Sequence, residues 1–252
     1  MQKKDTSWGN VAGWYDNHLS SDKDSYHTQV ISPNLMRLMT LEEGEKVLDL
    51  ACGTGFFSQE FSKAGAHVIG VDISEELILI AKKGSLENVT FFVSSSHNLS
   101  MIKDDSIDKV AFVLAIQNVE KPRETLLECY RVLKSQGKMF IVMNHPAFRI
   151  PKGSSWGWNG TTEKQYRRVD IYLSESRTEI EMHPGEKQNE QTISFHRSLQ
   201  YYFKIFTNSG FAATRLEEWI SHKKSESGPR QKEEDRMRKE IPLFLFIELT
   251  KF

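Results

Sequence analysis

The sequence is poor in the features that define several other classes of protein. Its 252 residues contain two cysteines, Cys52 and Cys129, too few to build a disulfide framework or a structural zinc site. The longest apolar run, Val110–Ile116, has seven residues, whereas a helix that crosses a bilayer needs about 20. The first residues, Met1–Asp5, are polar and lack the apolar segment of a signal peptide. These absences exclude membrane-spanning and disulfide-stapled proteins and predict a soluble, cytoplasmic one.

An excess of charge of either sign is also missing. The 33 Lys and Arg residues are balanced by 34 Asp and Glu residues, which gives a net charge of -1. The protein as a whole therefore has no electrostatic attraction for nucleic acid or for an anionic membrane. Large rings, in contrast, are abundant, with fifteen Phe and five Trp residues. So many large apolar side chains must fill a core or line a pocket.

From residue 46 onward, short apolar strands alternate with helices. The apolar spacing and the boundary residues predict strands over 46–50, 67–72, 88–93, 107–116 and 138–144, and helices over 56–63, 74–83 and 123–134. Gly137 is expected to end the last of these helices. Strands that alternate with helices form a mostly parallel sheet, because each right-handed crossover needs a helix.

The last part of the chain departs from this alternation. Residues 146–197 show no clean period, a helix is expected over 199–208, and two strands follow over 211–220 and 243–252. A charged segment that contains a helix near 229–240 connects these two strands, which suits an antiparallel pair at a sheet edge. The predicted fold is α/β: a doubly wound, mostly parallel, seven-stranded Rossmann-like sheet with a C-terminal antiparallel strand pair and an insertion after the fifth strand.

The sharpest pattern is the segment Val47–Gly55, in which a strand runs into a glycine turn and then into a helix. Glycine lets the backbone approach a ligand without a Cβ in the way. Asp72 stands seventeen residues after Gly55, at the end of the next strand, where a carboxylate can accept hydrogen bonds from both hydroxyls of a ribose. The pattern predicts a nucleoside cofactor. The simpler alternative is that the glycines only tighten a turn and that Asp72 caps the next helix.

Two classes of cofactor fit this geometry. The dinucleotide fingerprint needs a third glycine where this chain has Ser58, and the second dinucleotide-binding half is missing. The segment Asp49–Gly55 instead resembles the first motif of class I S-adenosylmethionine-dependent methyltransferases, and Val71–Asp72 resembles their acidic second motif. The resemblance, to small-molecule members of the methyltransferase type 11 kind, covers residues 41–145 and 199–252. It implies S-adenosyl-L-methionine as the cofactor, S-adenosyl-L-homocysteine as its product and methyl transfer as the activity.

The resemblance also implies which residues contact the cofactor. Asp72 would bind the ribose, and Ser95 takes the place of the acid that often binds the adenine amine in this family. The N-terminal Tyr15 resembles lid residues that close over the cofactor. The implied cofactor-binding residues are Tyr15, Asp49, Ala51, Gly53, Thr54, Gly55, Asp72, Ile73, Ser95, Ser96, His97, Leu114 and Ala115.

The open face of such a sheet lies at the carboxyl ends of its strands. We expect residues 1–40 to form an N-terminal helical lid, 41–145 and 199–252 to form the Rossmann-like core, and 146–198 to form a substrate-covering insertion. The alternative for the insertion is a small satellite core under a long loop. The residues expected to contact the substrate are Gln117, Asn118, Trp156 and Trp158.

Methyl transfer from a sulfonium is an in-line displacement, so the enzyme mainly aligns the reactants and excludes water. A base is needed only if the acceptor is protonated at neutral pH. His145 directly follows the fifth strand and is the best candidate, the alternative being a structural, hydrogen-bonded histidine. His18, His183 and His196 are weaker candidates, and no metal site is expected.

The expected partner is a small, partly apolar or aromatic methyl acceptor. An RNA or protein methyltransferase is the first alternative, since basic residues adjoin a ring at 164–168, and it would show a continuous basic rim around the cleft. Residues 146–200, however, hold eight Lys and Arg against seven Asp and Glu. The second alternative is a non-catalytic cofactor-binding module, which turnover with any acceptor would eliminate. No membrane partner is expected, and the sequence leaves the acceptor atom and the oligomeric state open.

Overall fold

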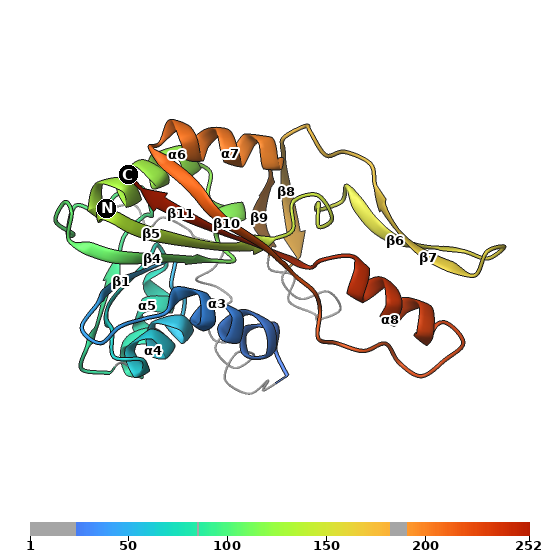
Figure 1. Ribbon diagram of the computed structural model, residues 1–252, viewed down its shortest axis with the longest axis horizontal. Helices are drawn as coiled ribbons and strands as arrows, with labels where there is room; N and C mark the ends of the chain where they lie inside the picture. Colours follow the sequence, from blue (N-terminus) through green and yellow to red (C-terminus); the bar gives the residue numbers. More distant parts are fainter. Residues whose placement is uncertain (1–23, 85, 182–190) are drawn as a thin grey trace.

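A computed structural model describes residues 24–84, 86–181 and 191–252 of the chain. Its central sheet has seven strands in the order β10-β11-β5-β4-β1-β2-β3 (Figure 1). The strands are β1 (Lys46–Leu50), β2 (His67–Asp72), β3 (Val89–Val93), β4 (Ile107–Val113), β5 (Leu133–Asn144), β10 (Phe211–Trp219) and β11 (Phe244–Lys251). β11 runs antiparallel to both of its neighbours, β5 and β10. Within the described ranges, no helix is both long and apolar enough to cross a membrane.

Helices cover both faces of this sheet, as Figure 1 shows. The helices on one face are η1 (His27–Ile31), α3 (Ser32–Met39), α4 (Phe56–Lys63) and α5 (Glu75–Lys83), and those on the other are α6 (Pro122–Val132) and α7 (Leu199–Asn208). Apolar residues one helical turn apart point into the core, as Phe57 and Phe61 of α4 and Tyr202 and Phe206 of α7 do. The doubly wound α/β fold predicted from the sequence is thereby confirmed.

Three predicted boundaries near β4 and β5 are wrong. The helix α6 ends at Val132 rather than at Lys134, because its last carbonyls, of Arg131 and Val132, accept hydrogen bonds from the loop before β4, over 3.0 and 2.9 Å. β5 therefore begins at Leu133, and Gly137 lies inside this strand instead of ending the helix. β4 ends at Val113, since the next residue, Leu114, takes a left-handed conformation, and a short 3₁₀ turn, η2 (Ile116–Asn118), follows.

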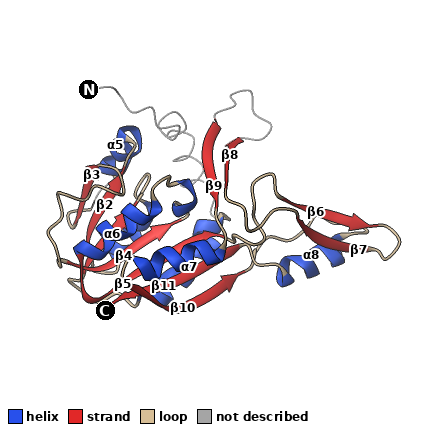
Figure 2. Cartoon of the chain, turned by 90° about the horizontal axis from the view of Figure 1, so that it is seen from above, coloured by secondary structure: helices blue, strands red, loops and turns tan. Residues whose placement is uncertain are grey.

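The segment between β5 and α7 forms two antiparallel strand pairs. One consists of β6 (Ser154–Asn159) and β7 (Lys164–Val169), and the other of β8 (Ser176–Glu181) and β9 (Gln191–His196). The pair β6–β7 extends away from the central sheet and packs against α8 (Gln231–Glu240), as both Figure 1 and Figure 2 show. We call β6, β7 and α8 the arm. The pair β8–β9 instead lies beside η2, where the central strands end.

Gly70 in β2 has no room for a side chain, because a Cβ there would lie 2.4 Å from the ring of Phe91. We predict that Gly70→Ala lowers the free energy of unfolding by about 1–3 kcal/mol through overpacking. Gly160→Ala is the matched control, since nothing lies within 4 Å of its added Cβ, and its effect should stay within about 0.5 kcal/mol. Chemical denaturation measures the free energy of unfolding of both variants. Equal losses in the two variants would contradict the prediction, because they would mean that the Phe91 ring moves aside at little cost.

Candidate cofactor site

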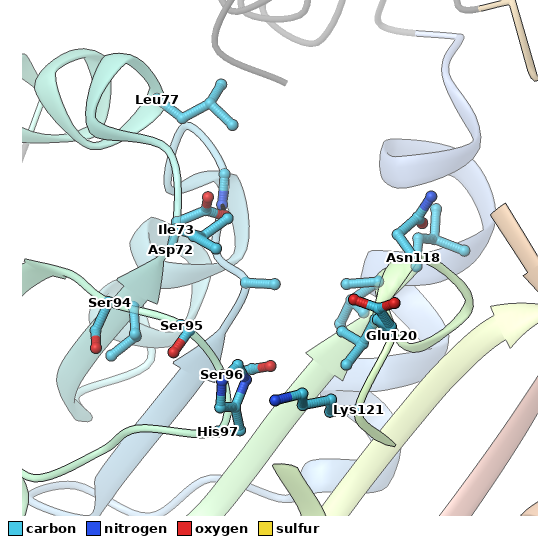
Figure 3. Close-up of a pocket in the computed structure, with 17 residues that line it drawn as sticks. Asp72, Ile73, Leu77, Ser94, Ser95, Ser96, His97, Asn118, Glu120 and Lys121 are labelled. Carbon is cyan, nitrogen blue, oxygen red and sulfur yellow. Dashed lines mark hydrogen bonds between the residues drawn. The ribbon is translucent and has the colours of Figure 1, made fainter. Parts of the chain in front are cut away.

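A cavity of about 470 Å³ opens at the carboxyl ends of β1, β2 and β4 (Figure 3). The chain order reverses between β1 and β4, and α/β sheets bind their ligands at such a switch point. The volume lies in the range typical of small-molecule sites. The lining residues are Ala51, Gly53, Val71, Asp72, Ile73, Leu77, Ser94, Ser95, Ser96, His97, Val113, Leu114, Ala115, Asn118, Val119, Glu120 and Lys121.

The glycine turn after β1 forms one wall of this cavity. Ala51 and Gly53 both have positive φ angles, 55° and 56°, so the chain reverses within a few residues of the strand end. Gly55 also has a positive φ, 82°, and donates its N–H to the carbonyl of Cys52 over 2.9 Å. A left-handed alanine is strained, and such conformations concentrate at functional sites. The turn thus holds backbone, rather than side chains, against the cavity.

Asp72 fixes this turn to the end of β2. Its Oδ2 accepts a hydrogen bond from the Gly53 N–H over 2.9 Å, and its Oδ1 accepts one from the Ser74 N–H over 2.9 Å. Burial raises the pKa of this carboxyl, while the backbone N–H groups act in the opposite direction. Each oxygen keeps a further lone pair. Because Asp72 lines the cavity, those lone pairs can accept hydrogen bonds from two neighbouring hydroxyls.

Asp49 lies below the turn rather than in the lining of the cavity. It is only 2% exposed, and its Oδ2 accepts a hydrogen bond from the Ser58 hydroxyl over 2.6 Å. Burial raises the pKa of Asp49 to about 7, and the nearby Asp72 adds to the shift. Ser58 stands where a dinucleotide fingerprint would have glycine. Its hydroxyl instead donates a hydrogen bond to the buried carboxyl of Asp49.

The segment after β3 forms the second wall. The N–H of Ser94 donates to the carbonyl of Asp72 over 2.8 Å, which continues the sheet by one bond. Ser96 shares a hydrogen bond of 2.8 Å with Thr125 of α6. Ser95 and His97 also line the cavity, on the side that Figure 3 shows opposite Asn118 and Glu120. The polar side chains of this wall are therefore hydroxyl and imidazole groups, and none of them is a carboxylate.

The third wall follows β4 and is held by β9. Leu114, at the end of β4, has a φ of 53°, and its carbonyl accepts a hydrogen bond from the Gln117 side chain over 2.6 Å. Asn118 donates to the carbonyl of Ile193 in β9 over 2.9 Å. Arg197, only 5% exposed, donates to the carbonyls at 119 and 120 over 3.0 and 3.2 Å. The insertion thus supports the cavity through backbone carbonyls.

The structure brings most of the expected cofactor residues together at this cavity. Those that line it are Ala51, Gly53, Asp72, Ile73, Ser95, Ser96, His97, Leu114, Ala115 and, from the expected substrate set, Asn118. Asp49, Thr54, Gly55 and Gln117 are not among the lining residues. Tyr15, His18 and His183 lie outside the described residues.

Trp156 and Trp158 lie in β6 of the arm and do not line the cavity. The Arg167 guanidinium lies 5.2 Å from the Trp156 ring centroid, and that of Arg230 lies 4.7 Å from the Trp158 ring centroid. Each ring therefore forms a cation–π interaction with an arginine of the chain, which is favourable in itself. Their expected role toward a substrate stays a prediction.

His145 is almost fully buried at the end of β5. Its Nε2 lies 2.8 Å from an oxygen of Glu218, and its Nδ1 accepts a hydrogen bond from the Ala147 N–H over 3.2 Å. An Nδ1 that accepts requires the proton of a neutral ring to be on Nε2. Burial lowers the pKa of His145, although Glu218 opposes the shift. His145 does not line the cavity, and its expected catalytic role stays a prediction.

Some lining residues were not expected from the sequence. They are Val71, Leu77, Ser94, Val113, Val119, Glu120 and Lys121. Leu77 lies in the first turn of α5, and its N–H donates to the Ser74 cap. The capping pattern in the sequence therefore indicated where this residue would lie. Glu120 and Lys121 reach the cavity because η2 turns the chain back toward it, and no spacing in the sequence indicates that turn.

Comparisons with known proteins agree with this geometry. Residues 48–141 match the family described as "Methyltransferase domain". Demethylmenaquinone methyltransferase of Clavibacter sepedonicus is 34% identical over 142 residues, which cover 53% of this chain and 57% of that relative. Ubiquinone biosynthesis O-methyltransferase of Xanthomonas oryzae pv. oryzae (strain PXO99A) is 33% identical over 101 residues, covering 39% and 42%. The chain thus matches about half the length of these curated relatives.

Solved structures match over more of the chain. A putative S-adenosylmethionine-dependent methyltransferase from Listeria monocytogenes superposes with a TM-score of 0.69 at 25% identity, covering 88% of this chain and 98% of that one. A structure from Mesorhizobium loti gives 0.71 at 22% identity, with 88% and 99% covered. The described residues therefore share the fold of these S-adenosylmethionine-dependent methyltransferase structures. Within that fold, residues 48–141 match the family described as a methyltransferase domain.

The raised pKa of Asp49 predicts a stability that depends on pH. In the folded protein this carboxyl keeps its proton up to about pH 7, whereas the unfolded chain loses it near pH 4. The free energy of unfolding should therefore fall as the pH rises from about 4 to 7, and then level off. Asp49→Asn cannot ionise and still accepts from Ser58. It should be more stable than the wild type at pH 8, on the order of 3 kcal/mol, and much less so at pH 4.

Urea denaturation at pH 4, 6 and 8 measures this difference. Glu87→Gln, an exposed substitution in the loop before β3, is the control and should give a small, constant difference. A difference between Asp49→Asn and the wild type that does not change with pH would contradict the prediction.

Proposed function

We propose that the protein is an S-adenosylmethionine-dependent methyltransferase that acts on a small, partly apolar or aromatic acceptor. The observation that carries the proposal is Asp72, which two backbone N–H groups hold at the end of β2, where it faces a cavity of about 470 Å³. A carboxylate in this position at the switch point of an α/β sheet suits a ribose.

The lining fits the other parts of such a cofactor. Apolar groups of Ile73, Leu77 and Val113 can cover an adenine ring and its surroundings, while Ser95 and His97 offer polar atoms to the ring edge. The glycine turn and the strained end of β4 present backbone to the amino-acid portion. The cavity therefore has acceptors where hydroxyls would lie and apolar surface where a ring would lie, which is how ligand sites are commonly built.

Bound S-adenosylmethionine supplies an electrophilic methyl group. The chain itself has to align an acceptor and keep water away, and its rigid walls suit that task. Asn118 and Arg197 tie the wall after β4 to β9, so movement of the insertion would shift the edge where an acceptor enters. Gln117 donates to the Leu114 carbonyl beneath this wall, and its buried Oε1 has no hydrogen-bond partner in the described structure.

The acceptor class rests on two supports. The curated relatives are named for demethylmenaquinone and for ubiquinone biosynthesis, and quinones contain a ring. The charges at the mouth of this cavity are also mixed, since Glu120 stands beside Lys121 there. A continuous basic rim, which a nucleic acid would require, is therefore interrupted at this edge.

The ribose assignment predicts the effect of changing Asp72. Asp72→Asn keeps a similar shape but loses the charge and one of the two acceptors for the backbone N–H groups of Gly53 and Ser74. It should therefore weaken binding of S-adenosylhomocysteine by about 1.5–3 kcal/mol in isothermal titration calorimetry. Asp170→Asn should leave the affinity unchanged. The circular dichroism spectrum and the melting temperature establish that the variant is folded. Unaltered affinity in a folded Asp72→Asn protein would refute the assignment.

Turnover separates a methyltransferase from a binding module. We expect S-adenosylhomocysteine to form when the protein is incubated with S-adenosylmethionine and a set of quinols. Little of it should form when total RNA replaces the quinols. The Asp72→Asn protein at the same concentration serves as the control for contaminating activity. Product formed with RNA but with none of the quinols would favour the alternative substrate class, and none with either would favour the binding module.

A further inference from the structure

Three arginines converge at the base of the arm, where it joins the central sheet. Arg149 follows β5, Arg167 lies on β7 and Arg238 lies on α8, and all three line one small cavity of about 20 Å³. Its other lining residues are Trp156, Ser221, Ile241, Pro242 and Leu243. None of them lines the large cavity at the ends of β1, β2 and β4, so this is a separate place on the molecule.

The arginines have no acidic partner among residues 24–84, 86–181 and 191–252. Arg167 donates to the carbonyl of Phe148 and to the hydroxyl of Ser154, both over 2.7 Å, and Arg238 donates to the hydroxyl of Ser225 over 3.1 Å. These contacts leave most of the guanidinium N–H groups free to donate elsewhere, because each arginine carries five.

Burial and mutual repulsion both act on this cluster. Burial lowers the pKa of Arg149, Tyr26 opposes that shift, and the charge of Arg238 adds to it. Burial and the charge of Arg149 do the same for Arg167. Like charges that are partly withdrawn from water destabilise the fold unless an opposite charge joins them. The neighbouring Arg168 shows the ordinary solution, since its side chain forms an ion pair of 2.6 Å with Asp170.

We propose that Arg149, Arg167 and Arg238 form a binding site for a phosphate group, either free or as a phosphate monoester. Guanidinium groups bind phosphate oxygens through paired N–H donors, and a charge near −2 would offset the repulsion among three cations. The cavity has room for about one oxygen of such a group, and the rest of the phosphate would lie at its opening. Ser221 supplies a hydroxyl at the same place, and the Arg167 guanidinium already lies on the ring of Trp156.

A phosphate at this position would join three parts of the chain. Arg167 and Arg238 belong to the arm, while Arg149 and Ser221 belong to the segments that leave β5 and β10. Binding would therefore fasten the arm to the sheet and stabilise the folded protein as any ligand of the native state does. The proposal does not depend on the methyltransferase activity.

The test is thermal unfolding of the full chain with inorganic phosphate, against sodium chloride at the same ionic strength. We expect phosphate to raise the melting temperature of the wild type more than chloride does. Titration calorimetry with inorganic phosphate should show that Arg149→Gln and Arg238→Gln each weaken binding about tenfold or more. Arg168→Gln is the matched control on the same strand as Arg167 and should bind phosphate as the wild type does.

Glycerol 3-phosphate, titrated in parallel, separates the two sources of the group. Tighter binding of the ester supports a phosphate monoester ligand, and tighter binding of inorganic phosphate supports the free ion. Arg238→Lys keeps the charge and should retain part of the affinity, which covers the case in which a glutamine variant fails to fold. Equal effects of phosphate and chloride on the wild type, or the same phosphate affinity in Arg168→Gln and Arg149→Gln, would overturn the proposal.

Discussion

The contact between Asp72 and the backbone N–H groups of Gly53 and Ser74 is the constraint on which the large cavity depends. It satisfies donors of the glycine turn and of the loop before α5, which would otherwise be buried without partners. In the same step it fixes a carboxylate at the carboxyl end of β2. The hydrogen bonds that shape the backbone and the acceptor that a ligand needs are therefore provided by one side chain, and the loss of Asp72 would affect both.

The opposite wall depends on the insertion. Leu114 follows β4 in a strained conformation, and η2 comes next, with Ile116 buried in the core. Asn118 and Arg197 attach this wall to the end of the insertion through the carbonyls of residues 119, 120 and 193. The insertion therefore has at least two separate parts. β8–β9 supports the cavity, whereas β6–β7 joins α8 in the arm.

Local rules predicted the helices 56–63 and 199–208 and the strands 46–50 and 67–72 correctly, because apolar periodicity and caps act over a few residues. They failed where distant contacts decide. α6 stops at Val132 because the loop before β4 captures its last carbonyls. β6 and β7 have no fully buried residue, and the buried residues of β9 are polar, so neither pair shows an apolar period. The role of Asp49 toward the cofactor, which the resemblance implies, stays a prediction. Only packing shows that this side chain is buried beneath the turn and accepts a hydrogen bond from Ser58.

Composition misses the arginine cluster for a related reason. Residues 146–200 are nearly neutral when their charges are counted, and this balance alone argues against a basic surface there. The charge count adds up side chains that lie on opposite faces of β7 and so have different neighbours. Arg168 reaches Asp170, while its neighbour Arg167, on the other face of β7, meets Arg149 and Arg238 and no acid in the described structure. Neutrality of a segment therefore says little about the field at one point within it, because field strength depends on which charges are near and how well water screens them.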